Sequence, residues 1–182
     1  MIEKTESEIL TLRKVTPADL PAAAEYRAEF LASGDTMDGC SNLRRFENMA
    51  DWYNWICKAE HWETCPAGWV PDTQFISIRK SDGALVGMLD IRHVLNDACL
   101  NLFGNIGYSI RPSQRRKGYA TEQLRLALPI CKSMNMDHVL VTCHKENTAS
   151  AKTIQKNGGV FENEVMDERN GEVLQRYWID LR

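Results

Sequence analysis

The segment Ile110–Ala120 is the part of the chain whose residue types and spacing most clearly predict chemistry. Its sequence, IRPSQRRKGYA, joins an alternating strand pattern directly to a helical pattern. The first N–H groups of a helix have no acceptor within the helix and carry partial positive charge, so they bind anions. Arg115, Arg116 and Lys117 add three cations, and Gly118 leaves out a side chain where an anion must approach the backbone. The segment therefore predicts a diphosphate site, with a solvated basic turn as the alternative.

An alternation of strand and helix patterns surrounds this loop and predicts a single α/β domain over residues 1–182. Period-two alternation predicts about seven strands in a mixed sheet, and apolar residues three or four apart predict about four amphipathic helices. No repeat, low-complexity tract or linker divides the chain. The expected strands cover residues 9–15, 74–79, 85–91, 105–111, 138–143, 160–166 and 173–179. The expected helices cover residues 17–32, 43–60, 118–134 and 147–157, with a kink at Pro129.

The composition argues against several classes of function. The 182 residues contain 22 Lys and Arg against 25 Asp and Glu, and the net charge of −3 gives no overall basic field for nucleic acid. No run approaches the roughly 20 apolar residues that a membrane-spanning helix needs. The N-terminal sequence MIEKTESEIL has no apolar signal core. We therefore expect a cytoplasmic protein that binds neither nucleic acid nor membrane.

Six cysteines invite a metal or disulfide interpretation that their spacing does not support. No two of them form a CxxC pair, and the four histidines are scattered. Because no secretion signal is expected, reduced thiols that pack as small hydrophobic side chains explain them better. We predict no metal site. The six are Cys40, Cys57, Cys65, Cys99, Cys131 and Cys143.

The spacing within the basic loop distinguishes it from two common phosphate-binding motifs. It has neither the GxxxxGK[ST] spacing of nucleoside-triphosphate loops nor the GxGxxG of dinucleotide folds. Instead, Arg115-x-x-Gly118-x-Ala120 resembles the R/Q-x-x-G-x-G/A signature of the GCN5-related N-acetyltransferases, the GNAT superfamily. As in that superfamily, a strand ending in Arg-Pro precedes the loop and a helix follows it.

Further segments extend the resemblance over almost the whole chain. The pattern NxxSxxxIxxxGG from Asn147 to Gly159 resembles the second half of the superfamily's acyl-CoA site. Four runs are similar to an uncharacterised bacterial branch of the superfamily, and they cover residues 85–93, 107–112, 156–159 and 176–179. The resemblance implies the GNAT fold, in which two central parallel strands of a mixed sheet splay apart. Here those strands are 105–111 and 138–143.

The resemblance also implies acetyl-CoA as co-substrate. Its pantetheine arm would lie between the splayed strands, and backbone groups of Ser109, Ile110 and Arg111 would bind the arm and the thioester. Backbone amides would hold the pyrophosphate, and they belong to Arg116, Lys117, Gly118, Tyr119, Ala120 and Thr121. The side chains of Arg115, Arg116 and Lys117 would add affinity.

The helix after the second splayed strand supplies the remaining candidates for CoA binding. The resemblance implies that Asn147 contacts the CoA arm, and an N-cap role for the same side chain is compatible with that contact. Ser150 and Lys152 are further candidates, although both residues could equally belong to a solvated helix face.

The reaction that the resemblance implies is direct attack of an acceptor amine on the thioester, without an acyl-enzyme. Positioning of the amine and polarisation of the carbonyl would accelerate it. A base must take a proton from the ammonium, and an acid must serve the CoA thiolate. In related enzymes a Tyr seven residues after the Asn often serves the thiolate, and some carry a Glu five residues before the Asn. Here Ile154 and Thr142 stand at those positions.

Other residues must then supply the catalytic groups. Asp90 and His93 are the candidates for the base beside the expected acceptor cleft, with a hydrogen bond at the strand end as the alternative. Tyr108 could donate a proton to the thiolate, or alternation could bury it in the core. His144 lies at a strand end near the Asn147 turn, and solvation explains it.

The acceptor pocket is expected from the first two helices, the loop between them and the last hairpin. Three acidic residues beside the first helix could attract a cationic amine or merely solvate a loop: Glu29, Asp35 and Asp38. Four tryptophans could line the pocket or cage an ammonium, although core packing explains them equally: Trp52, Trp55, Trp62 and Trp69.

We therefore expect an acetyl-CoA-dependent N-acetyltransferase that acts on a primary amine, with a small-molecule amine slightly favoured over a protein amine. The absence of the Tyr and the Glu leaves open a non-catalytic acyl-CoA binder or sensor. A plain interaction module is a third alternative. Relatives are often homodimers, and the last strands could pair across such an interface.

Overall fold

The computed structural model describes residues 1–182 and contains two antiparallel sheets with helices packed against them. The first sheet has the order β1-β2-β3-β4-β5, with bounds Lys4–Glu6, Leu10–Lys14, Asp72–Arg79, Leu85–Arg92 and Ile106–Ile110. The second sheet has the order β6-β8-β7, with bounds His138–His144, Glu172–Asp180 and Val160–Asp167. The helices are α1 (Leu20–Ser33), α2 (Met49–Ala59), α3 (Tyr119–Ser133) and α4 (Thr148–Lys156). The predicted α/β fold class is confirmed.

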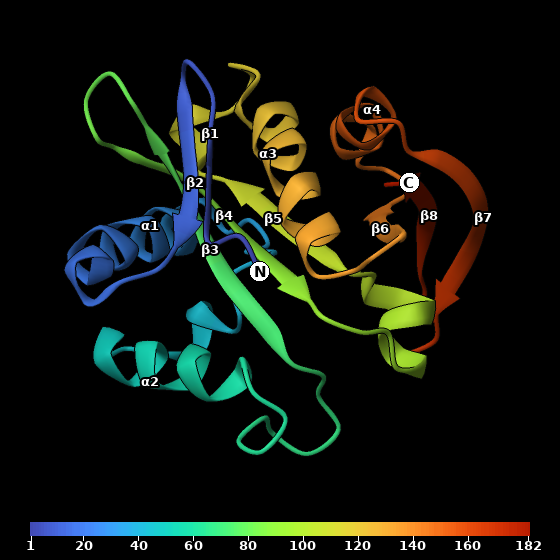
Figure 1. Cartoon of the computed structure of the whole chain (residues 1–182), viewed down its shortest axis with the longest axis horizontal. Helices are drawn as coiled ribbons and strands as arrows, with labels where there is room; N and C mark the ends of the chain where they lie inside the picture. The colour runs from blue at the N-terminus through green and yellow to red at the C-terminus, as the bar shows by residue number, and fades with distance from the viewer.

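The two faces of the five-stranded sheet carry different helices (Figure 1). Met88 and Ile76 point to the side where α1 and α2 pack, and they share a core with Tyr26, Phe30 and Trp52. The alternate residues of β3 and β4 point to the other side, where α3 packs, and they form the larger core. Period-two alternation along β4 therefore separates an α1 and α2 face from an α3 face.

The sheets meet at one junction between β5 and β6. The Asn105 backbone N–H donates to the Leu140 carbonyl at 2.7 Å, and the Leu140 N–H donates to the Asn105 side-chain oxygen at 2.9 Å. Beyond the junction both strands advance toward α4, where the Tyr108 hydroxyl meets Ser150, but no ladder joins them. They splay apart, as predicted for the central pair.

Several elements differ from the patterns in the sequence. The strand β1 adds a short hairpin to the edge of the first sheet. The predicted helix 43–60 divides into a 3-10 turn, Leu43–Arg45, and α2, because Phe46 is extended and the Asn48 side chain caps α2 by accepting the Ala50 N–H. A π-helical turn, Cys99–Phe103, precedes β5. The helix α3 continues through Pro129.

Four of the six cysteines are buried, and none forms a disulfide. No helix combines the length and the apolar composition that crossing a membrane would require.

Candidate active site

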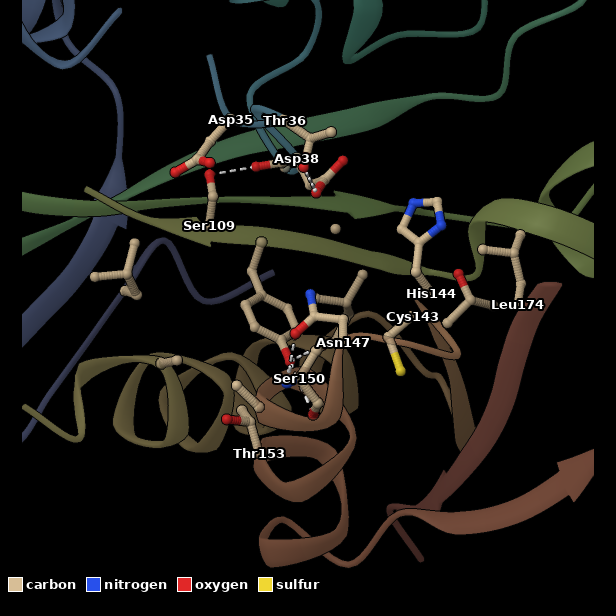
Figure 2. Close-up of a pocket in the computed structure, with 18 of the residues that line it drawn as sticks. Asp35, Thr36, Asp38, Ser109, Cys143, His144, Asn147, Ser150, Thr153 and Leu174 are labelled. Carbon is tan, nitrogen blue, oxygen red and sulfur yellow. Dashed lines mark hydrogen bonds between the residues drawn. The ribbon is translucent and has the colours of Figure 1, made fainter. Parts of the chain in front are cut away.

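A cleft of about 880 Å³ opens where β5 and β6 diverge (Figure 2). Its walls come from the loop before residue 40, β5, the start of α3, the end of β6, the start of α4 and the β7–β8 turn. Most of the predicted site residues line it: Tyr108, Ser109, Ile110, Arg115, Arg116, Gly118, Tyr119, Ala120, Thr121, Asn147 and Ser150. Five predicted residues do not line it: Asp90, His93, Arg111, Lys117 and Lys152.

The N-terminus of α3 presents a row of free backbone donors to the cleft. None of the N–H groups from Arg116 to Thr121 donates a hydrogen bond within the chain. The row curves because Arg116 and Gly118 have φ angles of 61° and 83°, in the left-handed region. A Cβ at Gly118 would meet no atom within 4 Å, so the space beside this backbone is open. Successive free amides at a helix N-terminus form an anion cradle.

The basic side chains of the loop are mostly engaged by other groups. Arg115 Nη1 lies 2.6 Å from Asp35 Oδ2, and its guanidinium lies 5.5 Å from the centre of the Phe30 ring. Lys117 Nζ donates to the Gln114 side-chain oxygen at 2.9 Å. Arg116 alone has no partner within the chain and lines the cleft. The backbone row, more than the three side-chain charges, therefore defines this anion site.

Arg111 lies behind this loop, bound to α1. Its Nε donates to Glu29 Oε2, and the Ser113 backbone N–H donates to Glu29 Oε1 at 2.6 Å. This carboxylate thus holds the end of β5 and the start of the loop against α1.

The backbone edges of β5 and β6 face each other across the gap without pairing. Arg92 N–H donates to the Asn105 carbonyl and Arg111 N–H donates to the Val86 carbonyl, so the odd-numbered residues of β5 bond to β4. The alternation directs the N–H and C=O of Tyr108 and the N–H of Ile110 into the gap, whereas the Ile110 carbonyl accepts Arg115 Nε–H at 3.2 Å. The same reasoning from β8 directs the N–H and C=O of Thr142 and the N–H of His144 into it from β6, whereas the His144 carbonyl accepts the Asn147 N–H at 2.8 Å. An extended ligand can add here as a strand would.

The start of α4 forms the floor of this gap. Asn147 is the N-cap of α4, because its Oδ1 accepts the Ser150 N–H at 3.0 Å, and its side-chain amide remains free to donate to a ligand. The Tyr108 hydroxyl lies 2.8 Å from the Ser150 hydroxyl, so a pair of hydroxyls joins β5 to α4. Burial raises the pKa of Tyr108.

The loop Asp35–Gly39 covers the α1 and α2 side of β5. The Ser109 hydroxyl donates to the Asp38 carbonyl and lies 3.1 Å from the Tyr26 hydroxyl. A Cβ at Gly39 would lie 2.4 Å from the Gly107 oxygen, so two glycines allow the loop backbone to rest directly on β5. The loop therefore forms a fixed wall of the cleft.

Asp90 and His93 are held by hydrogen bonds within the first sheet. Asp90 is 3% exposed, its Oδ1 accepts the Gly107 N–H at 3.1 Å, and Arg92 Nη2 lies 3.2 Å from it. His93 Nε2 lies 2.8 Å from the Thr73 hydroxyl, which donates to Glu60. Burial raises the pKa of Asp90 and lowers the pKa of His93. Neither side chain faces the gap between β5 and β6.

A second buried carboxylate accompanies Asp90. Asp72 is 3% exposed, its Oδ2 accepts the Ser41 hydroxyl at 3.0 Å, and its Oδ1 has no partner. Burial and the neighbouring charge of Asp90 raise the pKa of Asp72 to about 7.

The far end of the cleft includes residues that the sequence patterns did not single out. Arg169 stacks 5.0 Å from the centre of the Phe103 ring, and its guanidinium bonds Asp167 at 2.8 and 2.6 Å. Glu172 also lines the cleft, together with His144, for which the sequence suggested only solvation. The charges in the turn between β7 and β8 are the only sign of these residues in the sequence. No local pattern indicates that this turn lies beside β6.

The splayed strand pair and the row of free amides at the start of α3 together are the features expected of an acetyltransferase fold. The model of the acetyltransferase (GNAT) domain matches residues 10–160, and the chain belongs to this family. A comparison with curated proteins finds no match.

Solved structures confirm the fold. A GNAT-family acetyltransferase from Bacillus anthracis aligns with a TM-score of 0.65 and 21% identity over 98% of both chains. Ribosomal-protein-S5-alanine acetyltransferase from Vibrio fischeri aligns with a TM-score of 0.73 and 15% identity over 97% of this chain and 96% of that one. Spermidine N-acetyltransferase from Vibrio cholerae, solved with CoA and spermine, aligns with a TM-score of 0.66 and 16% identity. The alignment covers 94% of this chain and 95% of that one.

Proposed function

We propose that the protein transfers the acetyl group of acetyl-CoA directly to a primary amine. The observation that carries this proposal is the continuity of two sets of unpaired backbone groups. The free amides from Arg116 to Thr121 lead into the free edges of β5 and β6 within one cleft. A diphosphate followed by an extended amide-containing arm has the charge and the hydrogen-bonding groups to satisfy both.

In this proposal the pyrophosphate binds the backbone cradle, with Gly118 leaving the approach open and Arg116 adding an unpaired cation. The arm lies along Tyr108 and Ile110, and its polar groups replace a missing strand. The Asn147 amide donates to the arm while its oxygen caps α4. Lys117 and Lys152 contribute through charge alone, because neither lines the cleft.

The thiolate that leaves the thioester needs a proton, and we assign this role to Tyr108. Ile154, which stands where many relatives have the Tyr, is completely buried in the core. Thr142, which replaces the Glu of some relatives, donates its hydroxyl to the Leu102 carbonyl at 2.8 Å. The hydroxyl pair of Tyr108 and Ser150 lines the cleft at the floor of the gap and supplies a hydroxyl donor there.

The acceptor reaches the thioester from the side of the loop Asp35–Gly39. Glu29 and Asp35 are engaged by arginines, whereas Asp38 has no cationic partner and lines the cleft. A free carboxylate favours an acceptor that carries positive charge. We therefore favour a small cationic amine over a protein amine. Spermine lies in one of the similar structures and a ribosomal protein is the substrate named for another, so both classes belong in the test.

The test is CoA release, measured with a thiol reagent, across spermidine, lysine, a monoamine and a peptide with an N-terminal alanine. We expect release with at least one amine and fastest release with spermidine. Binding of acetyl-CoA without turnover on any of them would favour the sensor alternative. Failure of acetyl-CoA to bind would favour an interaction module, since ligand at 100 times its Kd should stabilise a binding protein by about 2.7 kcal/mol.

A further inference from the structure

His144 is the last residue of β6, and it has an acidic partner on the neighbouring strand. Its Nδ1 lies 3.3 Å from Glu172 Oε2, and no group of the chain bonds Nε2. Both side chains line the cleft and are about half exposed. The pair therefore presents one imidazole nitrogen to the cleft while a carboxylate holds the other.

The imidazole lies on the side of the gap from which the acceptor arrives. Side chains alternate along β6, so Cys143 packs into the core toward α4 while Thr142 and His144 point the other way. In Figure 2 the imidazole extends toward Asp38 and Thr36, and the Cys143 sulfur points in the opposite direction. The backbone of His144 borders the slot in which the arm is expected to lie.

Given the proposed acetyl transfer, on which this inference rests, we propose that His144 is the base that deprotonates the acceptor ammonium and that Glu172 orients it. Nε2 takes one proton from R–NH3+. The amine lone pair then forms the C–N bond, and the C–S bond breaks with its electron pair on sulfur. Tyr108 gives its hydroxyl proton to the thiolate, the second proton of the nitrogen restores the Tyr108 hydroxyl, and the imidazolium returns its proton to water.

The charges around His144 suit this role. Glu172 on β8 receives Nδ1–H, which leaves Nε2 as the basic nitrogen, and it also accepts the Asn170 amide at 2.7 Å. Asp167 on β7 faces the same space but is neutralised by Arg169. Asp38 approaches from the covering loop. The carboxylates of Glu172 and Asp38 add negative charge to the cleft, which attracts a cationic acceptor toward the imidazole.

The chain contains a matched control on the same strand. His138 begins β6 and lies 3.8 Å from Asp180 on β8, so it repeats the histidine and carboxylate arrangement outside the cleft. His93 is the rival base expected from the sequence. The variants to compare are His144→Gln, Glu172→Gln, His138→Gln and His93→Gln.

The experiment measures kcat/KM for spermidine, or for the panel amine that wild type acetylates fastest, between pH 6 and about 9.5, together with acetyl-CoA affinity. General-base catalysis predicts that His144→Gln loses about 100-fold at pH 7 with unchanged acetyl-CoA affinity. The loss should shrink as pH approaches the acceptor's own pKa, about 10.4 for an alkylamine, because more of the amine is then already neutral. Glu172→Gln should lose less with the same pH dependence, and His138→Gln should match wild type.

Equal losses at every pH would overturn the base assignment, because a structural defect does not depend on the acceptor's protonation. Wild-type activity in His144→Gln, or the predicted profile in His93→Gln instead, would overturn it as well. These results leave the proposed function intact. Absence of acetyl transfer in wild type on every amine would instead refute the proposed function and, with it, the role of His144.

Discussion

Asn105 and Leu140 hold β5 and β6 together at a single point, through one backbone bond of 2.7 Å and one side-chain bond of 2.9 Å. The side chain of Asn105 also donates to the Arg92 carbonyl at 3.2 Å, so one residue connects β4, β5 and β6. Because pairing ends there, the strands are free to diverge and the cleft opens.

The variant Asn105→Leu tests this junction. It keeps the approximate volume but leaves the buried Leu140 N–H without its acceptor, which should lower the free energy of unfolding by about 1–3 kcal/mol. The KM for acetyl-CoA should rise several-fold, because the slot begins at this residue. Denaturant unfolding and initial-rate kinetics measure the two effects. A destabilised variant with an unchanged KM would show that the junction does not position the slot.

Gly118→Glu tests the anion cradle. The new carboxylate would project into open cleft space beside the free amides, so acetyl-CoA affinity should fall by about 100-fold or more, equivalent to about 2.7 kcal/mol. The matched control is Gly118→Ala, which has the same unfavourable φ of 83° but no charge. Calorimetric titration with CoA checks both. Equal affinities of the two variants would show that no anion binds there.

Asn147→Ala separates the two roles of that side chain. Loss of the cap should reduce stability by about 1 kcal/mol. Loss of the free amide should also weaken acetyl-CoA binding. Asn147→Asp keeps an oxygen for the Ser150 N–H but removes the donor, so it should retain stability and lose affinity. If Asn147→Asp bound acetyl-CoA as tightly as wild type, the residue would be a cap alone.

Asp38→Asn tests the preference for a cationic acceptor. Because Asp38 is the loop acid without an arginine partner, the KM for spermidine should rise about fivefold, while a monoamine should be less affected. Asp35→Asn provides the contrast, since Asp35 pairs with Arg115 of the anion loop and should affect acetyl-CoA instead. Steady-state kinetics with both substrates varied provide the measurement. A rise in the KM for acetyl-CoA with Asp38→Asn, and in the KM for spermidine with Asp35→Asn, would contradict the assignment.

The buried Asp72 predicts a dependence of stability on pH. Its pKa is raised from 3.8 to about 7 in the folded protein, so the folded state binds the proton more tightly than the unfolded chain does. The contribution of this group therefore becomes less favourable as pH rises from about 4 to 7 and then stays constant. Asp72→Asn should flatten this decline and stabilise the protein above pH 7. Urea unfolding of both proteins at pH 5 and 7.5 provides the measurement, and parallel pH profiles would contradict the assignment.

The sequence predicted those features that depend on neighbouring residues. Gly118 and Asn147 were identified because a helix start, a missing side chain and a cap are encoded within a few positions. The order of strands and helices followed from periodicity for the same reason. The family resemblance then connected the two motifs across the chain.

The remaining features depend on distant partners. The pairs of Arg115 with Asp35 and Arg111 with Glu29 join residues separated by 80 and 82 positions, so no local pattern could show that these cations are engaged. The strand pattern around Asp90 allowed a hydrogen bond at the strand end but could not show that its partner is the Gly107 N–H of the neighbouring strand. No local pattern shows that His144 has an acidic partner, because Glu172 belongs to a strand that only the fold brings beside it.

The most direct test of the central claim is a single-turnover reaction of the protein with acetyl-CoA labelled in the acetyl group and spermidine or another panel amine, followed by mass spectrometry. The account predicts label on the amine nitrogen and one free CoA per product, no labelled protein at any time, and much slower transfer by Gly118→Glu at the same acetyl-CoA concentration. Label retained on the protein, or acetyl-CoA bound without any transfer, would contradict it.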